Sequence, residues 1–146
     1  MTEHRPKLVP EFMVTDFQKS LGFYVDLLGF TVMYDRPATG FAFLTLGGAE
    51  IMIEQQTDFW ETARPEYPYG RGVSFQIEVA SVAPIVGRLG DAGVALFRPP
   101  EDAWYRRDDT YLGNRQFLVL DPDGFVLRLY EDLGENAAPS SGRIVS

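Results

Sequence analysis

Phe43-Leu-Thr-Leu-Gly-Gly-Ala-Glu-Ile-Met-Ile-Glu54 and Phe117-Leu-Val-Leu-Asp-Pro-Asp-Gly-Phe-Val-Leu-Arg128 share one pattern, and this pair of stretches decides the fold. Each stretch has an apolar run, a turn rich in glycine or aspartate, and a second apolar run. The two align without gaps at a constant offset of 74 residues. Further upstream, Val14 matches Val79 at an offset of 65. Because internal repeats indicate repeated structural units, we predict two copies of one small module.

The expected elements occur in the same order in both halves. Module one, at about 7–56, has a strand at 8–14, a helix capped by Asp16, and strands at 30–35, 41–46 and 50–55. Module two, at about 72–132, has a strand at 73–79, a helix capped by Ser81, and strands at 94–97, 116–120 and 125–130. The predicted fold is therefore α+β. Two tandem βαβββ modules form a curled mixed sheet around a central cleft, with the helices outside.

The length of 146 residues fits one domain, which we place at residues 1–134. Residues 135–146 have the composition of a linker, so we predict a flexible C-terminal tail there. The only histidine, His4, falls in the N-terminal segment and is expected to be solvated.

Charge and cysteine content limit the partners and the compartment. A net charge of -8 argues against nucleic-acid binding, because phosphates are bound by Lys and Arg. There is no apolar run long enough to span a bilayer and no apolar core of a signal peptide, so we expect no membrane partner. With no cysteine in the sequence, the reducing cytoplasm is the expected location.

Four motifs carry a resemblance to a known family. They are Val14-Thr-Asp16, Ser20-Leu-Gly-Phe-Tyr24, Leu28-Gly-Phe30 and Asp121-Pro-Asp-Gly124. In this order they resemble the vicinal oxygen chelate superfamily, which includes glyoxalase I, extradiol dioxygenases and the bleomycin-resistance proteins. The resemblance is strongest to the bleomycin-resistance group, through Ile51-Met-Ile-Glu-Gln55, Gly70-Arg-Gly-Val-Ser-Phe-Gln-Ile77 and Phe125-Val-Leu-Arg-Leu-Tyr130.

The resemblance places the metal ligands of the metal-dependent members at Val9, Glu54, Ser74 and Arg128. Only Glu54 is a strong ligand, and Arg128 is a permanent cation that would repel an ion. We therefore expect no metal and no cofactor. Glu54 and Arg128 occupy equivalent positions in the two repeats, so they are expected either to form a charge-assisted pair in the shared cleft or to lie unpaired at its rim.

Strand alternation adds neighbours to this set. Glu11 shares a face with Val9, Gln76 shares one with Ser74, and Gln116 is expected to face the same concavity. These groups suit recognition of amide, amine or guanidinium groups. Gln76 and Gln116 could equally be solvated strand residues.

Aromatic residues are concentrated in two segments that we predict to be loops. Trp60 lies in the segment that links the modules, and Trp104-Tyr105 lies within 98–107. Such side chains can stack on flat ligand rings, and tryptophan also attracts cations. The resemblance implies a homodimer with ligand clefts at its interface. The alternative is that Trp60 and Trp104 close the ends of the sheet or form the dimer contact.

Three functions remain open from the sequence. The first is a metal-independent binding protein that sequesters a planar, cationic, bleomycin-like compound. The second is a metal-independent lyase or isomerase of a small metabolite, with Glu11 or Glu54 as general base and Arg128 as oxyanion stabiliser. The third is a module without a small ligand. No cysteine, usable histidine or Gly-x-Ser-x-Gly motif supplies an activated nucleophile, so we favour the binding protein.

Overall fold

The computed structural model describes residues 6–146, so His4 lies outside the described residues. The chain forms two compact units, residues 6–67 and 68–146, and each unit contains one of the predicted modules. The α+β class and the two βαβββ modules are therefore confirmed. Each module has a mixed sheet of its own, and a cleft shared by both modules stays a prediction.

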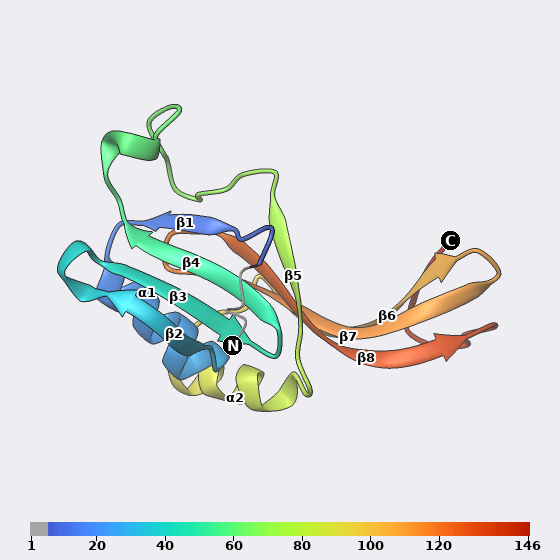
Figure 1. Cartoon of the computed structure of the whole chain (residues 1–146). Coiled ribbons are helices and arrows are strands. Elements are labelled where there is room, and N and C mark those ends of the chain that lie inside the picture. The colour runs from blue at the N-terminus through green and yellow to red at the C-terminus, as the bar shows by residue number, and fades with distance from the viewer. Residues whose placement is uncertain (1–5) are drawn as a thin grey trace, which may run out of the picture. The chain divides into compact units, whose positions relative to one another are not determined.

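The first unit is a four-stranded sheet with helix α1 on one face (Figure 1). Its strand order is β1-β4-β3-β2, in which β1 is parallel to β4 and the other pairs are antiparallel. Parallel strands cannot be joined by a tight hairpin, and here the helical segment, β2 and β3 all lie between β1 and β4 in the chain. The elements are β1 (Glu11–Val14), α1 (Phe17–Gly22), η1 (Phe23–Leu28), β2 (Thr31–Arg36), η2 (Pro37–Thr39), β3 (Phe41–Leu46), β4 (Ala49–Gln55) and η3 (Asp58–Trp60).

Asp16 begins α1 as predicted, because its carboxylate accepts the Lys19 N–H at 3.1 Å. The helix then widens into the single π-helical segment η1 and ends at Gly29, whose φ of 94° is left-handed. The widening turns Phe23 and Tyr24 into the core, with exposed fractions of 6% and 0%.

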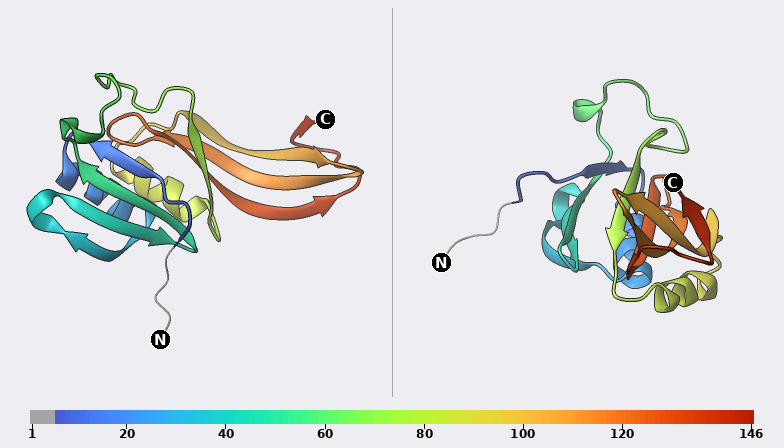
Figure 2. Two further views of the ribbon diagram at one scale, coloured as in Figure 1. Left: turned by 45° about the horizontal axis from the view of Figure 1, so that its top comes forward. Right: turned by 90° about the vertical axis from the view of Figure 1, so that its right-hand side faces the viewer.

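The second unit repeats this order and adds one strand. Its sheet runs β5-β8-β7-β6-β9, with β5 parallel to β8. The elements are β5 (Ser74–Glu78), α2 (Ala83–Asp91), β6 (Arg98–Arg107), β7 (Thr110–Leu120), β8 (Val126–Asn136) and β9 (Arg143–Val145). Figure 2 shows β6, β7 and β8 continuing past the end of β5 as a long curved ribbon. Within residues 6–146, no helix has the length and apolarity that crossing a bilayer needs.

Two predicted elements of module two are wrong. The strand expected at 94–97 lies outside the sheet, and the expected loop at 98–107 is the whole of β6. Prolines at its start suggested a loop, but β6 pairs with β7 and shows a register irregularity between Arg98 and Glu101. Ser81 does not cap α2. Instead, the carboxylate of Glu131 accepts the N–H of Val82 at 3.1 Å at the start of this helix.

The two repeats differ at their hairpins, so the gapless alignment is wrong there. In the first unit Leu46 pairs with Ala49, which leaves two residues in the turn. In the second unit Leu120 pairs with Val126, and the turn holds the five residues 121–125. This turn is built as the sequence indicates: Asp121 accepts the N–H groups of Asp123 and Phe125, each at 2.9 Å.

The end of the chain is strand where a flexible tail was expected. β8 continues to Asn136, and β9 pairs in parallel with β6 and forms the edge of the sheet. Arg143 of β9 fixes this contact, since its guanidinium binds the Glu101 carboxylate at 2.9 Å. The polar composition therefore concealed an edge strand that is held by an ion pair.

Candidate functional site

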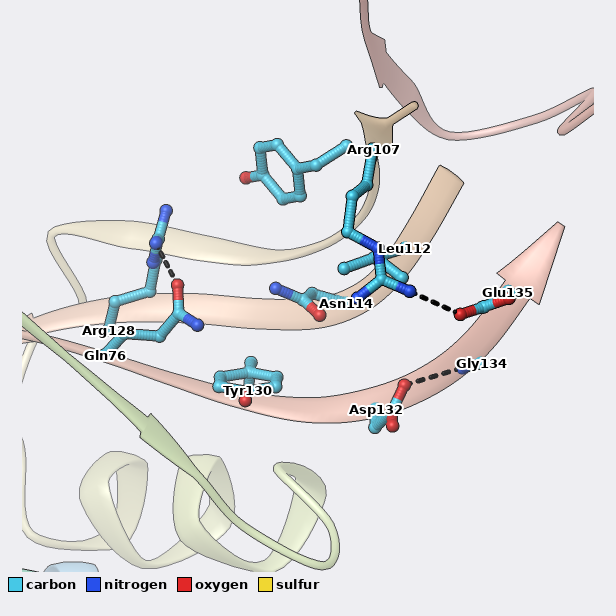
Figure 3. A pocket seen from close by; sticks show the side chains of 10 residues that line it. Gln76, Arg107, Leu112, Asn114, Arg128, Tyr130, Asp132, Gly134 and Glu135 are labelled. Carbon is cyan, nitrogen blue, oxygen red and sulfur yellow. Dashed lines mark hydrogen bonds and ion pairs between the residues drawn. The ribbon is translucent and has the colours of Figure 1, made fainter. Parts of the chain in front are cut away.

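The polar face of the second sheet forms a pocket of about 450 Å³ (Figure 3). Leu127 and Leu129 of β8 are fully buried, so strand alternation turns Arg128 and Tyr130 to the opposite face. The face of β6 and β7 that carries Tyr105 and Asn114 completes the hollow. The lining residues are Gln76, Tyr105, Arg107, Leu112, Asn114, Arg128, Tyr130, Asp132, Gly134 and Glu135.

Tyr105 is held in place by a hydrogen-bonded network. Gln116 is only 2% exposed, and its Nε2 donates to the Tyr105 hydroxyl at 2.5 Å and to Glu101 at 3.2 Å. Arg143 donates to the same hydroxyl at 3.0 Å and to Glu101 Oε1 at 2.9 Å. The Arg143 hydrogen bond lowers the pKa of the Glu101 carboxyl. The network thus fixes one aromatic wall of the pocket.

Arg128 is the central cation of the pocket. Its guanidinium donates a hydrogen bond to the amide oxygen of Gln76 and lies 6.0 Å from the centroid of the Tyr105 ring. Its Nε is buried without a hydrogen-bond partner, and within residues 68–146 no carboxylate forms an ion pair with it. Because its hydrogen-bond partner is a neutral amide, no carboxylate of the second unit compensates the positive charge of Arg128.

The far end of the pocket is more acidic. Glu135 pairs with Arg107 at 2.8 Å, whereas Asp132 accepts only the N–H of Gly134, at 2.7 Å, among the described residues. Between the two ends, the Tyr130 hydroxyl donates to Glu78 at 3.0 Å. Burial, followed by this hydrogen bond, raises the pKa of Tyr130, which keeps the phenol protonated.

The predicted residues Gln76, Tyr105, Gln116 and Arg128 come together in this site. Trp104 does not join them. It precedes Tyr105 on β6 and therefore points to the opposite face, where it covers Gly113 of β7. Ser74 begins β5 and is exposed outside the pocket lining.

The pocket also contains residues that the sequence analysis missed. Arg107 was assigned to a solvated loop, and the expected last strand stopped at Tyr130, so Asp132 and Glu135 were not considered. Residues 111–117 read Tyr-Leu-Gly-Asn-Arg-Gln-Phe and show no alternation with a period of two, so the sequence pattern gave no signal that this hairpin is longer.

Glu11 and Glu54 lie in the first unit, on the face of its sheet opposite α1. Their strands are adjacent, and the register places Met13 beside Glu54 and Met52 beside Glu11. Partial burial, then repulsion from Glu54, raises the pKa of the Glu11 carboxyl, and Arg36 opposes this shift.

An aromatic group that the sequence analysis missed lies on the same face. Tyr34 stacks on Phe43 at 5.2 Å with an interplanar angle of 15°, and the Arg36 guanidinium lies 3.8 Å from the Phe41 ring centroid. Tyr34 and Arg36 of the edge strand β2 are exposed side chains, and they cover the buried rings of Phe43 and Phe41.

Trp60 belongs to the short helix η3 and is 58% exposed. Its ring meets that of Phe59 edge to face at 4.7 Å. The expected aromatic loop between the modules is therefore present, and a ligand contact at Trp60 stays a prediction.

The proposed pair of Glu54 and Arg128 also stays a prediction, because the two residues belong to different units. The register of the two sheets shows that Glu54 and Arg128 are not at strictly equivalent positions. Glu54 pairs with Phe41 of β3, whereas Arg128 pairs with Leu118 of β7, an offset of 77 instead of 74. Arg128 lies on the polar face of the second sheet, whereas Glu54 shares its face of the first sheet with Phe41 and Phe43.

The residues at the family's metal positions do not suit a divalent ion. Val9 offers no donor, Ser74 is a weak neutral ligand and Arg128 is cationic, which leaves one carboxylate, Glu54. Within residues 6–146, no cluster of three or more His, Cys, Asp or Glu side chains is arranged to hold a metal.

Solved structures share this fold. A protein of unknown function from Agrobacterium tumefaciens str. C58 is 25% identical with a TM-score of 0.66, and the match covers 90% of this chain and 98% of that chain. TnmS3, an antibiotic binding protein from Streptomyces sp. CB03234, is 24% identical with a TM-score of 0.58, over 89% of this chain and 99% of that one. TioX from Micromonospora sp. ML1 is 23% identical with a TM-score of 0.65, over 88% and 100%.

Residues 9–129 match the Glyoxalase/Bleomycin resistance protein/Dioxygenase superfamily, and the chain belongs to it. The bleomycin resistance protein of Geobacillus stearothermophilus is 26% identical over 135 residues, which covers 86% of this chain and 96% of that protein. The bleomycin resistance protein of Staphylococcus aureus (strain N315) matches over the same shares. The resemblance found in the sequence motifs is therefore confirmed.

Proposed function

We propose that this protein is a metal-independent binding protein of the bleomycin-resistance type, which sequesters a planar, positively charged small molecule. The observation that carries the proposal is the pocket of the second unit, where Tyr105 and Tyr130 provide flat apolar surface beside the carboxylates of Asp132 and Glu135. Aromatic faces and carboxylates together attract flat cations. The relatives named bleomycin resistance protein support the same ligand class.

The proposal includes a homodimer in the cytoplasm, and its binding domain extends beyond the expected limit of 134, because Glu135 lines the pocket. Ligand clefts at the dimer interface would complete the pocket with side chains from a second copy. Sedimentation velocity at micromolar concentration tests this part, and a monomer that binds ligand with full affinity would contradict it.

Calorimetric titration with metal-free bleomycin and with copper-loaded bleomycin tests the ligand class. Ligand present at about 100 times its Kd should add ~2.7 kcal/mol to the free energy of unfolding. Tyr105→Ala is expected to weaken binding at least tenfold, because it removes one aromatic wall. Tyr67→Ala is the matched control, since Tyr67 is 62% exposed and lies outside the pocket. No heat and no change in Tm with either bleomycin form would contradict the proposal.

A second candidate function rests on Glu11. Its raised pKa, caused by partial burial and by Glu54, is the property expected of a carboxyl that exchanges protons with a substrate. This favours a metal-independent lyase or isomerase of a small metabolite. Turnover of a metabolite that is abolished in Glu11→Gln but retained in Tyr105→Ala would support the enzyme over the binding protein.

A further inference from the structure

Every second residue of β8 from 128 to 132 lines the pocket, and the three side chains of this row differ in charge. Arg128, Tyr130 and Asp132 alternate with buried or half-buried residues, so all three face the pocket. A strand rises about 3.3 Å per residue, which places the Cα atoms of Arg128 and Asp132 about 13 Å apart. The row therefore presents a cation, an aromatic ring and an anion in this order along one strand (Figure 3).

The other charged groups around the pocket already have partners. Glu135 neutralises Arg107 at 2.8 Å, and Glu101 neutralises Arg143 at 2.9 Å. The Tyr130 hydroxyl binds Glu78 at 3.0 Å. Glu78 keeps its charge but lies outside the pocket lining, so the lining itself retains one cation and one carboxylate that no ion pair of the second unit compensates.

These two groups are Arg128 and Asp132, the ends of the row. Arg128 binds only the neutral amide of Gln76 and has a buried Nε without a partner. Asp132 accepts one backbone N–H, from Gly134, and keeps further lone pairs for a ligand. Leaving a buried charged donor unpaired is costly, so a ligand oxygen that approaches Arg128 would recover part of that cost.

We propose that the ligand of this pocket is a flat zwitterion, with an anionic or carbonyl end bound by Arg128 and an ammonium end bound by Asp132. The ring between its charged ends packs between Tyr105 and Tyr130. This inference rests on the proposed binding function and narrows its ligand class, because a compound with positive charge alone would leave Arg128 unmatched.

The test uses three compounds with the same ring: 4-(aminomethyl)benzoate, 4-methylbenzylamine and 4-methylbenzoate. Binding to the whole protein is followed by NMR shifts of the amides of β8. The zwitterion is expected to bind at least tenfold more tightly than either compound with one charge, since it alone satisfies both ends of the row.

Two variants assign the ends. Arg128→Gln is expected to reduce the affinity for the zwitterion to that of 4-methylbenzylamine, and Asp132→Asn is expected to reduce it to that of 4-methylbenzoate. Arg128→Lys, which keeps the charge, should retain the preference for the zwitterion. Arg106→Gln and Asp109→Asn, two exposed charges outside the pocket lining, are the matched controls. Circular dichroism and Tm show whether each variant is folded.

The inference is overturned if 4-methylbenzylamine binds as tightly as the zwitterion, or if the zwitterion does not bind. A parallel titration with bleomycin separates this failure from that of the proposed function. Bleomycin binding without a zwitterion preference would leave the binding function standing and remove the inference. A zwitterion preference without bleomycin binding would keep the inferred ligand class of the pocket and remove the proposed binding of a bleomycin-like compound.

Discussion

The hydroxyl of Tyr105 lies 2.5 Å from Nε2 of Gln116, on the neighbouring strand of the second sheet. This bond links a wall of the pocket to an amide that is 2% exposed. The acceptor Glu101 also fixes the orientation of that amide, because a carboxylate accepts from the NH₂ group and not from the oxygen. As a consequence, Gln116 Oε1 is buried without a partner.

The unpaired oxygen leads to a prediction for two variants. Gln116→Leu fills nearly the same volume and removes the unpaired oxygen, whereas Gln116→Ala leaves a cavity. We expect Gln116→Ala to lower the free energy of unfolding by about 2 kcal/mol, and Gln116→Leu to lower it by less than about 1 kcal/mol. Urea unfolding at pH 7 measures both. Equal losses of unfolding free energy in the two variants would mean that the two hydrogen bonds donated by the amide contribute more to stability than the volume that the side chain fills.

A second prediction concerns Gly113, which lies under the ring of Trp104. A Cβ at Gly113 would stand 2.5 Å from Trp104 Cζ3, so Gly113→Ala forces the indole to move. We expect the variant to lose about 1–3 kcal/mol of unfolding free energy, which is typical of overpacking. Thermal and urea unfolding measure the loss.

A double variant distinguishes this clash from a general effect on β7. In a Trp104→Leu background the alanine should cost much less, because the smaller side chain leaves room for the new methyl group. If the free energy lost by the double variant equals the sum of the losses of the two single variants, the contact between residue 113 and the Trp104 ring is contradicted.

The repeat pattern was enough to predict the architecture of both units. The apolar runs fixed the equivalent strands, and Asp16 and Asp121 marked a helix start and a turn by local chemistry that does not depend on the rest of the chain. By contrast, β6 begins with Pro99 and Pro100, and prolines at an edge strand look like a loop in sequence. Its strand character comes from pairing with β7, a non-local contact.

The candidate site was predicted only in part for the same reason. The family resemblance placed Ser74 and Arg128 in one site, and strand alternation added Gln76, which is the register partner of Arg128 in the parallel β5–β8 pair. Asp132 was missed because its distance from the turn suggested that the strand had ended. Trp104 and Tyr105 were grouped by proximity in sequence, but adjacent residues of a strand face opposite sides.

A third prediction follows from the carboxyl pair of the first unit. Because burial and Glu54 raise the pKa of Glu11, the folded protein binds a proton more tightly there than the unfolded chain does. Stability contributed by this site is therefore lost as the pH rises above 4.5, the ordinary value, through the raised pKa. Glu11→Gln should raise Tm at pH 7 by a small amount, equivalent to less than about 1 kcal/mol for a partly exposed group. At pH 4 its Tm should equal that of the parent protein.

NMR titration of the Glu11 carboxyl separates the two causes of this shift. Glu54→Gln should lower the pKa of Glu11, because it removes the repulsion, and Arg36→Gln should raise it. A pKa of Glu11 that stays constant in both variants would leave burial as the only cause.

The last prediction concerns Arg143, which joins β9 to the wall of the pocket through Glu101 and Tyr105. Arg143→Ala is expected to release β9, so that the amide of Ile144 exchanges faster with deuterium. Because Arg143 lowers the pKa of Glu101, their pairing stabilises the fold above about pH 4.5, and this contribution is lost as the pH falls through the lowered pKa. The difference in unfolding free energy between parent and variant should therefore be below about 1 kcal/mol at pH 7 and should shrink as the pH falls through the lowered pKa of Glu101.

Arg115→Ala is the matched control, since Arg115 of β7 pairs with Asp102 of the neighbouring strand β6 at 2.8 Å and lowers its pKa in the same way. This variant should show the same dependence of stability on pH, because it also loses an exposed ion pair. It should leave exchange at Ile144 unchanged, because among the described residues Arg115 forms its hydrogen bonds with Asp102 of β6 and none with β9. If exchange at Ile144 is equally slow in both variants, backbone pairing with β6 is sufficient to hold β9, and Arg143 acts only on Glu101 and Tyr105.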